Sequence, residues 1–241
     1  PYAVAASNTG FIGQWWQGGA VGWVDTFQYL GSTFESAGSL GRELDRRLRL
    51  AGESFAKLWP RVLSAPIGLS TRVRIYATTV LPRLWYGAAE AWAPTQQQLR
   101  RLDVFHTTCL RRMLGCARRH PGMPSNEQVF RETGQRSVSA SLSLHRLRWL
   151  GHAARRPDTE GIKQLLFATA PGQVFQLRTD AWGHARGFTV DRRVMGGSRG
   201  TWGKLAAADL RELGARQGRD LQETWLAACS DRVQWRQLIA G

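Results

Sequence analysis

Hydrophobic and polar positions follow two different patterns along the chain. Residues 11–17 and 21–30 are aromatic and β-branched and are joined by Gly18 and Gly19, a pattern that predicts a β-hairpin. From Ser39 onwards, hydrophobic residues recur every three or four positions, which predicts amphipathic helices. We therefore expect a mainly α fold that begins with a short β-hairpin.

Three helices should follow this hairpin. The pattern places them at residues 39–63, 70–92 and 95–115. Ser39 and Ser70 are the expected N-caps of the first two, and Pro82 should kink the second. Thr95 and Gln98 have the spacing of a capping box, which predicts the start of the third helix.

A basic amphipathic helix is expected over residues 139–157. Its apolar stripe contains Leu142, His145, Trp149 and Ala153, with Leu150 beside it. Trp149 is therefore predicted to be a core residue. Other helices are expected at residues 126–132 and 159–168, with two more within 201–241. Residues 171–200 are rich in Gly and Arg and show no period, which indicates a long basic loop.

Several short sequences resemble boxes of non-LTR retrotransposon reverse transcriptases. Residues 147–156, LRWLGHAARR, resemble a box downstream of the polymerase domain, and residues 27–32, FQYLGS, resemble a box just beyond the palm. Similar stretches are LPRLWYGAAEAW at 81–92, LRRLDVFHTTCLRRMLG at 99–115, TWGKLAAADLRELG at 201–214 and CSDRVQWRQLI at 229–239. The set covers residues 21–240 in the family's order, although residues 197–200 depart from the family's usual sequence.

The resemblance implies the thumb and C-terminal region of such an enzyme, without the catalytic palm. The implied organisation is a β-hairpin remnant of the palm edge at 1–31, a thumb-like helical bundle at 32–120, a helical extension with the RLRWLGH box at 121–170, a basic loop or linker at 171–200, and a C-terminal helical pair at 201–241.

The carboxylates of a polymerase are missing from the sequence. Template-directed polymerisation needs paired metal ions on clustered carboxylates, which reverse transcriptases supply with a Tyr-x-Asp-Asp turn. The nine aspartates of this chain are single residues. The sequence also has no phosphate-binding loop, HExxH motif or GxSxG motif. We therefore expect no enzymatic activity and no cofactor.

One group of cysteine and histidine residues has the chemistry of a metal site. It contains His106, Cys109, Cys116 and His120. Packing in the third predicted helix explains the first two equally well, and the C-x6-C-x3-H spacing matches no zinc knuckle. We expect no bound metal here, and for His152 we favour a structural role over a catalytic one.

The charge of the chain favours a nucleic-acid partner. The 33 basic and 18 acidic residues give a net charge of +15, and lysines contribute only Lys57, Lys163 and Lys204. Arginine binds phosphate bidentately and stacks on bases. The predicted contact residues are Arg100, Arg101, Arg111, Arg112, Arg118, Arg119, Arg146, Arg148, Arg155, Arg156, Arg192 and Arg193. The alternative for each is a solvated basic surface.

Three functional hypotheses follow. The first is a non-catalytic RNA-binding protein derived from a reverse transcriptase, a structural subunit of a ribonucleoprotein assembly such as an organellar ribosome, in the mitochondrion or another organelle. Its expected partners are structured RNA, ribosomal RNA included, and other proteins of that complex. The second is the C-terminal nucleic-acid-gripping fragment of an active retrotransposon polymerase, which would work in the nucleus. The third is a protein-scaffold subunit of another large complex.

Two further expectations concern the ends of the chain and membranes. Because the chain begins with Pro1, we expect a processed product or part of a longer reading frame. No apolar run reaches the roughly 18 residues of a transmembrane helix, so no membrane partner is expected.

Overall fold

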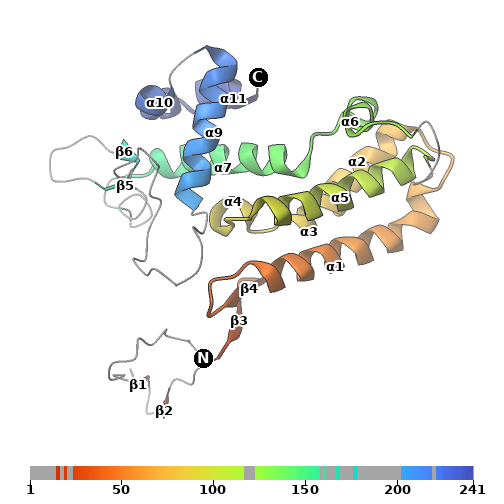
Figure 1. The fold of residues 1–241 in the computed structure, drawn as a ribbon, viewed down its shortest axis with the longest axis horizontal. Coiled ribbons are helices and arrows are strands. Elements are labelled where there is room, and N and C mark those ends of the chain that lie inside the picture. Colours follow the sequence, from red (N-terminus) through yellow and green to blue (C-terminus); the bar gives the residue numbers. More distant parts are fainter. Residues whose placement is uncertain are drawn as a thin grey trace.

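The computed structural model is mainly helical and has short antiparallel strands near its N-terminus (Figure 1). It describes residues 15–16, 19–20, 24–116, 123–157, 160, 167–168, 176–177, 202–218 and 221–240. The strand pairs are β1–β2 (Trp15–Trp16, Gly19–Ala20), β3–β4 (Thr26–Tyr29, Ser32–Glu35) and β5–β6 (Phe167–Ala168, Gln176–Leu177). The expected mainly α fold with a two-stranded hairpin near the N-terminus is confirmed. The predicted pairing of residues 11–17 with 21–30 is wrong for β3, which pairs with β4.

The sequence FQYLGS forms the turn of the β3–β4 hairpin. We expected it to end a single strand, and that prediction is wrong, because Tyr29 pairs with Ser32 across the turn. Leu30 and Gly31 occupy the turn with φ of 48° and 78°. Positive φ at both positions is the requirement of a type I′ turn. The pattern concealed this turn because leucine gives no signal for positive φ.

The first long helix is α1 (Gly41–Leu58), which continues into the π-helical turn η1 (Trp59–Leu63). Its N-cap is Leu40 and not the predicted Ser39, whose Oγ nevertheless accepts a hydrogen bond from the Gly41 N–H at 3.0 Å. The expected apolar stripe is confirmed by the buried Leu44, Ala51 and Phe55.

The second predicted helix is divided into three. Its parts are α2 (Leu69–Thr79), α3 (Leu81–Leu84) and α4 (Ala88–Ala91). Pro82 has no amide hydrogen and cannot continue the hydrogen bonding of α2, so the predicted kink is confirmed as a break. The N-cap of α2 is Gly68, and the predicted cap by Ser70 is wrong.

The third predicted helix is α5 (Gln96–Met113), and its capping box is confirmed. The Thr95 side chain accepts from the Gln98 N–H at 3.2 Å, and the Thr95 N–H donates to Gln98 Oε1 at 2.8 Å. Gly115, with φ of 76°, follows the helix. The next helix, α6 (Asn126–Thr133), matches its prediction and also begins with a capping box.

Helix α7 (Val138–Ala154) crosses the middle of the molecule and belongs to two hydrophobic cores (Figure 1). Val138 and Leu142 pack in a first core with residues of α1 to α6. Leu147, Leu150 and Ala153 pack in a second core with the C-terminal helices. Buried residues therefore lie on more than the single stripe that the pattern predicted.

Three helices, and not the predicted pair, follow in the C-terminal region. They are α9 (Trp202–Gln217), α10 (Leu221–Ser230) and α11 (Arg232–Ala240). The chain breaks at Asp231, whose Oδ1 accepts from the N–H groups of Val233 and Gln234 at 2.7 and 3.3 Å. An aspartate in this position caps a new helix, which explains the break.

Two predicted segments lie largely outside the described residues. Of the predicted helix at 159–168, the described residues include Phe167 and Ala168, which form a strand instead. Of the predicted basic loop at 171–200, the described residues are Gln176 and Leu177 in β6.

Candidate nucleic-acid interface

Three of the four arginines predicted on α5 lie at one groove. Arg100, Arg101 and Arg112 are exposed and line a groove between α1 and α5 with a volume of about 570 Å³. We call it the α1–α5 groove. Because a helix rises about 1.5 Å per residue, the three charges extend over roughly 18 Å along α5.

The floor of the α1–α5 groove is apolar. It contains Leu48 and Phe55 of α1 with Val104, Phe105 and Cys109 of α5. The sequence pattern assigned these aromatic residues to the core and missed the groove. Val104 is a hydrophobic residue of α5 that is 54% exposed. A valine outside the inward-facing positions of the helix was the one sign of this groove in the sequence. Arginines around an aromatic floor suit RNA, whose phosphates and splayed bases need both.

Two of the groove arginines have partners in α1 and η1. Arg101 Nη2 lies 2.6 Å from Asp45 Oδ1, and both side chains are largely exposed, so solvent screens this pair. The Arg112 guanidinium lies 4.2 Å from the centre of the Trp59 ring. Stacking uses the face of the guanidinium and leaves its N–H donors for an anion.

Arg111 does not line the α1–α5 groove. Its Nη2 donates to the Pro124 carbonyl at 3.2 Å and to Asn126 Oδ1 at 2.7 Å, and the side chain is half-buried. Arg111 therefore holds the start of α6 against α5. Arg100 and Arg111 are eleven residues apart, which is close to three full turns, yet the two side chains do not lie on one surface.

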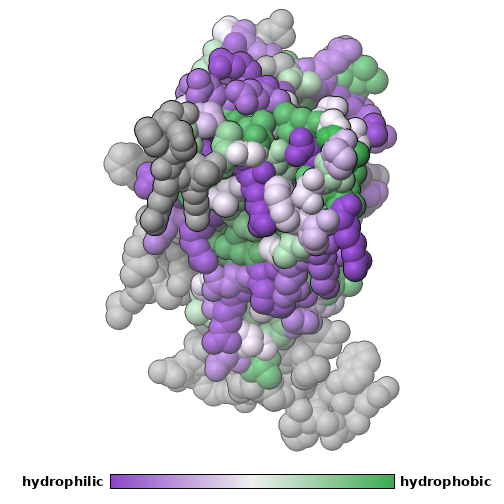
Figure 2. Space-filling view, turned by 90° about the vertical axis from the view of Figure 1, so that its right-hand side faces the viewer, coloured by the Kyte–Doolittle hydropathy of each residue, from purple (hydrophilic) through white to green (hydrophobic). Residues whose placement is uncertain are grey.

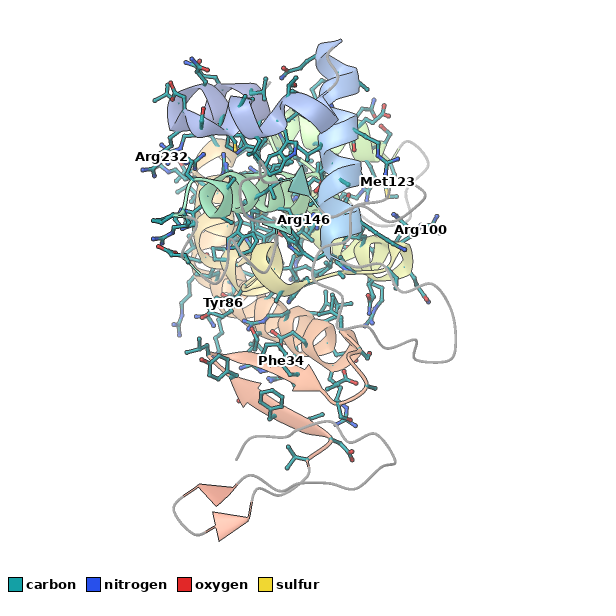
Figure 3. The ribbon with its side chains drawn as sticks, turned by 90° about the vertical axis from the view of Figure 1, so that its left-hand side faces the viewer. Phe34, Tyr86, Arg100, Met123, Arg146 and Arg232 are labelled. Atoms are coloured by element: carbon teal, nitrogen blue, oxygen red, sulfur yellow. The ribbon has the colours of Figure 1, made fainter. Side chains whose placement is uncertain are left out.

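Two of the predicted α7 arginines are part of the packing. Arg146 is 5% exposed, and its Nε and Nη2 donate to the Asp209 carboxylate at 2.7 and 3.3 Å. Figure 3 shows Arg146 well inside the molecule, among the helices. Arg155 is half-buried and donates to the Cys229 carbonyl at 2.7 Å. These pairings join α7 to α9 and α10, so we leave both arginines out of the candidate interface.

The other two α7 arginines are exposed. Arg148 and Arg156 lie on the solvent side of the helix with His152 between them. Arg156 Nε donates to His152 Nε2 at 3.3 Å, and Arg156 Nη1 lies 3.3 Å from Glu160 Oε1. Both remain candidates for contact with an anion.

Four predicted contact residues fall outside the described part of the chain. They are Arg118, Arg119, Arg192 and Arg193.

The residues of the candidate metal site are engaged in packing. His106 is buried, and its Nε2 must donate to the Arg136 carbonyl at 3.1 Å, so its Nδ1 accepts from the Tyr76 hydroxyl at 2.8 Å. Burial lowers the pKa of His106 to about 4 and raises the pKa of the Cys109 thiol to about 12. His120 lies outside the described residues. Within the ranges described, no group of three potential metal ligands is present.

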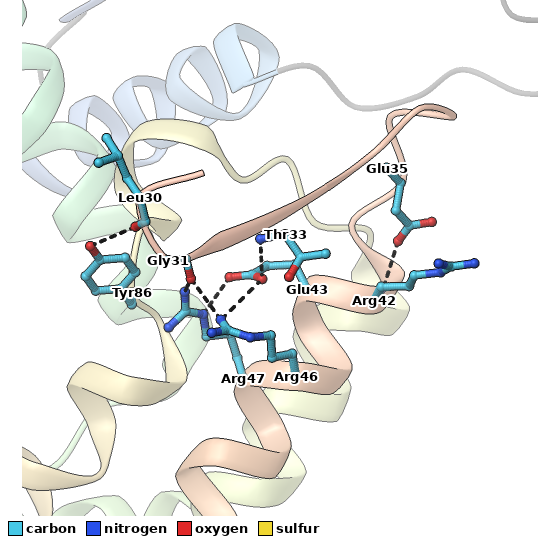
Figure 4. Close-up of polar contacts among 9 residues, drawn as sticks. All are labelled: Leu30, Gly31, Thr33, Glu35, Arg42, Glu43, Arg46, Arg47 and Tyr86. Atoms are coloured by element: carbon cyan, nitrogen blue, oxygen red, sulfur yellow. Dashed lines mark hydrogen bonds and ion pairs between the residues drawn. The ribbon is translucent and has the colours of Figure 1, made fainter. Parts of the chain in front are cut away.

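Residues from separate sequence boxes meet around the β3–β4 turn (Figure 4). The Tyr86 hydroxyl donates to the Leu30 carbonyl at 3.1 Å, and Arg47 donates to the Gly31 carbonyl. Arg47 also lies over the Tyr86 ring at 4.6 Å and pairs with Glu43 at 2.6 Å. The hairpin turn is therefore held by both α1 and the chain before α4.

Residues from the later boxes meet in the second core. Trp149 is half-buried and packs edge-on against Trp202, with ring centres 4.9 Å apart. The indole Nε1 of Trp235 donates to the Leu147 carbonyl at 3.0 Å, and the ring lies against Gly151. The predicted core position of Trp149 is thus confirmed in part. The boxes at 147–156, 201–214 and 229–239 form one packed unit.

The surface, the helices and the comparisons with known proteins add three findings. At the end of the molecule where α1, α5 and α6 meet, hydrophobic patches are bordered by hydrophilic side chains (Figure 2). Among the residues described, no helix has both the length and the apolar character to cross a bilayer. No protein-family model, curated protein or solved structure matches this chain.

Proposed function

We propose that this chain is a non-catalytic RNA-binding protein related to the thumb and C-terminal region of non-LTR reverse transcriptases. Its role is that of a structural subunit in a ribonucleoprotein assembly such as a mitochondrial ribosome. The observation that carries the proposal is the α1–α5 groove, where Arg100, Arg101 and Arg112 border an apolar floor. A net charge of +15 supports an anionic partner.

The packing of the sequence boxes supports the proposed relationship. The box at 27–32 contacts the box at 81–92, and the box at 147–156 contacts both terminal boxes. Contact between the boxes is an arrangement that the proposed relationship requires. The same observation also supports the second candidate, a C-terminal fragment of an active polymerase that grips nucleic acid.

Binding of a single-stranded RNA by a groove variant tests the main proposal. Replacing Arg100, Arg101 and Arg112 together with alanine should weaken binding and lower the salt slope by about one unit for each arginine that contacts phosphate. A matched variant replaces Arg42, Arg61 and Arg74, which are exposed elsewhere, and removes the same charge. Equal affinities and slopes for the two variants would contradict a role of the groove.

Primer extension tests the non-catalytic part of the proposal. We expect no template-dependent incorporation by the purified chain with Mg²⁺ or Mn²⁺, because the sequence carries no Asp-Asp pair for two metal ions. Incorporation that survives repurification would contradict it. Sequencing the parent transcript separates the structural subunit from the polymerase fragment, since the latter requires a palm in the same reading frame.

A further inference from the structure

Helices α7 and α11 pack side by side in opposite directions. Near the start of α11, Trp235 contacts Leu147 and Gly151 of α7. At its end, the Ala240 carbonyl accepts from Arg136 Nη2 at 3.3 Å, just before α7 begins. The contact residues therefore run in opposite order along the two helices, which makes the pair antiparallel.

This geometry brings exposed arginines of both helices to one side of the pair. A helix turns about 100° per residue. Arg148 and His152 are displaced from Gly151 by about 60° and 100°, and Arg232 and Arg236 are displaced from Trp235 by the same angles in the same sense. In an antiparallel pair, displacements of equal sense from the contact line point to the same side. Arg156 follows two residues after the end of α7 and lies beside His152, to whose Nε2 its Nε donates at 3.3 Å.

The resulting surface is basic, and the described residues that form it include no Trp, Tyr or Phe. We call it the α7–α11 face, formed by Arg148, His152, Arg156, Arg232 and Arg236, all exposed. Glu160 pairs with Arg156 at 3.3 Å, and the Asp231 carboxylate is bound to backbone N–H groups of its own helix. The arginines therefore outnumber the nearby carboxylates. Arg232 and Arg236 were not among the residues predicted from the sequence.

The α7–α11 face is separate from the α1–α5 groove. Figure 3 shows Arg232 and Arg100 at opposite edges of the molecule. The two surfaces also differ in chemistry. The groove offers an apolar floor between its arginines, whereas the face offers charges alone on two well-packed helices.

We infer that the α7–α11 face is a second RNA-binding site, which binds the sugar-phosphate backbone of double-stranded RNA. Packed helices lie about 8–10 Å apart, so Arg148 with Arg156 and Arg232 with Arg236 form two short rows of charge on a rigid support. Double-stranded RNA is recognised by its shape and backbone, which requires no aromatic stacking. RNA as the ligand class rests on the proposed function, but the surface and the residues that bind it differ from those of the α1–α5 groove.

Binding to two RNAs tests this inference. One probe is a blunt RNA duplex, and the other is an unstructured single strand. Replacing Arg148, Arg156, Arg232 and Arg236 with alanine should weaken duplex binding and lower its salt slope by about one unit per contacting arginine. The matched control replaces Arg42, Arg61, Arg74 and Arg131, which are exposed elsewhere and carry the same charge.

The outcomes separate this inference from the proposed function. Duplex binding that is equal in the face variant and the control variant overturns the inference. Polyglutamate that displaces a labelled RNA duplex from the unmodified chain as well as unlabelled duplex does also overturns it. Failure of the unmodified chain to bind either RNA overturns the proposed function as well. If the fourfold variant unfolds, the pairs Arg148 with Arg156 and Arg232 with Arg236 are replaced separately, and each pair should show part of the loss.

Discussion

Among the described glycines, Gly151 of α7 has the least room for a side chain. A Cβ atom added there would lie 2.3 Å from Nε1 and 2.5 Å from Cδ1 of Trp235. That indole is fixed, because its Nε1 donates to the Leu147 carbonyl at 3.0 Å. The glycine of the LRWLGH sequence therefore allows α11 to approach α7, and its role is one of space.

Replacing Gly151 with alanine should lower the free energy of unfolding by about 1–3 kcal/mol, because the Trp235 ring must move out of a packed core. Urea denaturation followed by tryptophan fluorescence measures the change. Gly52→Ala in α1 is the matched control, since the added Cβ would lie 3.8 Å from Cε2 of Phe105 in α5, an ordinary contact. The free energy of unfolding of the Gly52→Ala control should rise by about 0.5–1 kcal/mol, because alanine has the higher helix propensity. Changes of the same sign in both variants would contradict this explanation.

Leu30 is strained by its place in the β3–β4 turn. It has φ of 48° and is 74% exposed, so little burial offsets a conformation that costs an ordinary residue about 1–2 kcal/mol. Leu30→Asn should therefore raise the free energy of unfolding by about 1 kcal/mol, since Asn-Gly is a preferred type I′ pair. Chemical denaturation measures it. Gly31→Ala should lower the free energy of unfolding, because Gly31 also has positive φ. A higher free energy of unfolding in that variant would contradict the type I′ turn.

Among the elements, α2, α5 and α6 are joined by a buried stack of rings. His106 of α5 lies between Tyr76 and Phe130, with ring centres 5.7 and 5.9 Å apart and nearly parallel planes. Its two ring nitrogens are both hydrogen-bonded, to the Tyr76 hydroxyl and the Arg136 carbonyl. The stack therefore depends on a neutral imidazole.

Stability should depend on pH through His106. Its pKa is about 4 in the folded chain, against 6.5 for an ordinary histidine, so the unfolded chain takes up the proton first. The contribution of neutral His106 to the free energy of unfolding is complete above pH 6.5. It decreases by up to about 3 kcal/mol as the pH falls to about 4. Denaturation across this range should show a steeper pH dependence for the natural chain than for His106→Gln. Parallel curves would contradict a buried neutral histidine.

The elements that could be predicted from the sequence are those fixed by neighbouring residues. The capping box of Thr95 with Gln98 involves residues three apart, and the break at Pro82 follows from a missing amide hydrogen. The burial of Arg146 could not be predicted, because it depends on Asp209, 63 positions away. The groove was missed for a similar reason, since its walls are α1 and α5, two helices separated along the chain.

On the scale of the whole molecule, α7 couples the two cores. Leu142 of this helix belongs to the first core, and Leu147 and Leu150, roughly one and two turns further along, belong to the second. Neither core keeps its full set of contacts if this helix unfolds. The two halves of the molecule should therefore unfold together.

Leu150→Ala tests this coupling. Leu150 is fully buried in the second core, so its truncation should cost about 2–5 kcal/mol. Hydrogen exchange should then become faster in α5 as well as in α9, because unfolding of α7 opens both cores. Val104→Ala, on the exposed side of α5, is the control and should change neither. Exchange that accelerates in α9 alone would show two independent units.

The contact between Gly151 and Trp235 also has a consequence for synthesis of the chain. The helix that bears Gly151 emerges from the ribosome well before α11, which follows 84 residues later. At about 5–20 residues per second, the part of α7 around Gly151 waits roughly 4–17 s for Trp235, although α9 and α10 emerge earlier. The final packing of the second core therefore waits until α11, the last helix described, has been synthesised.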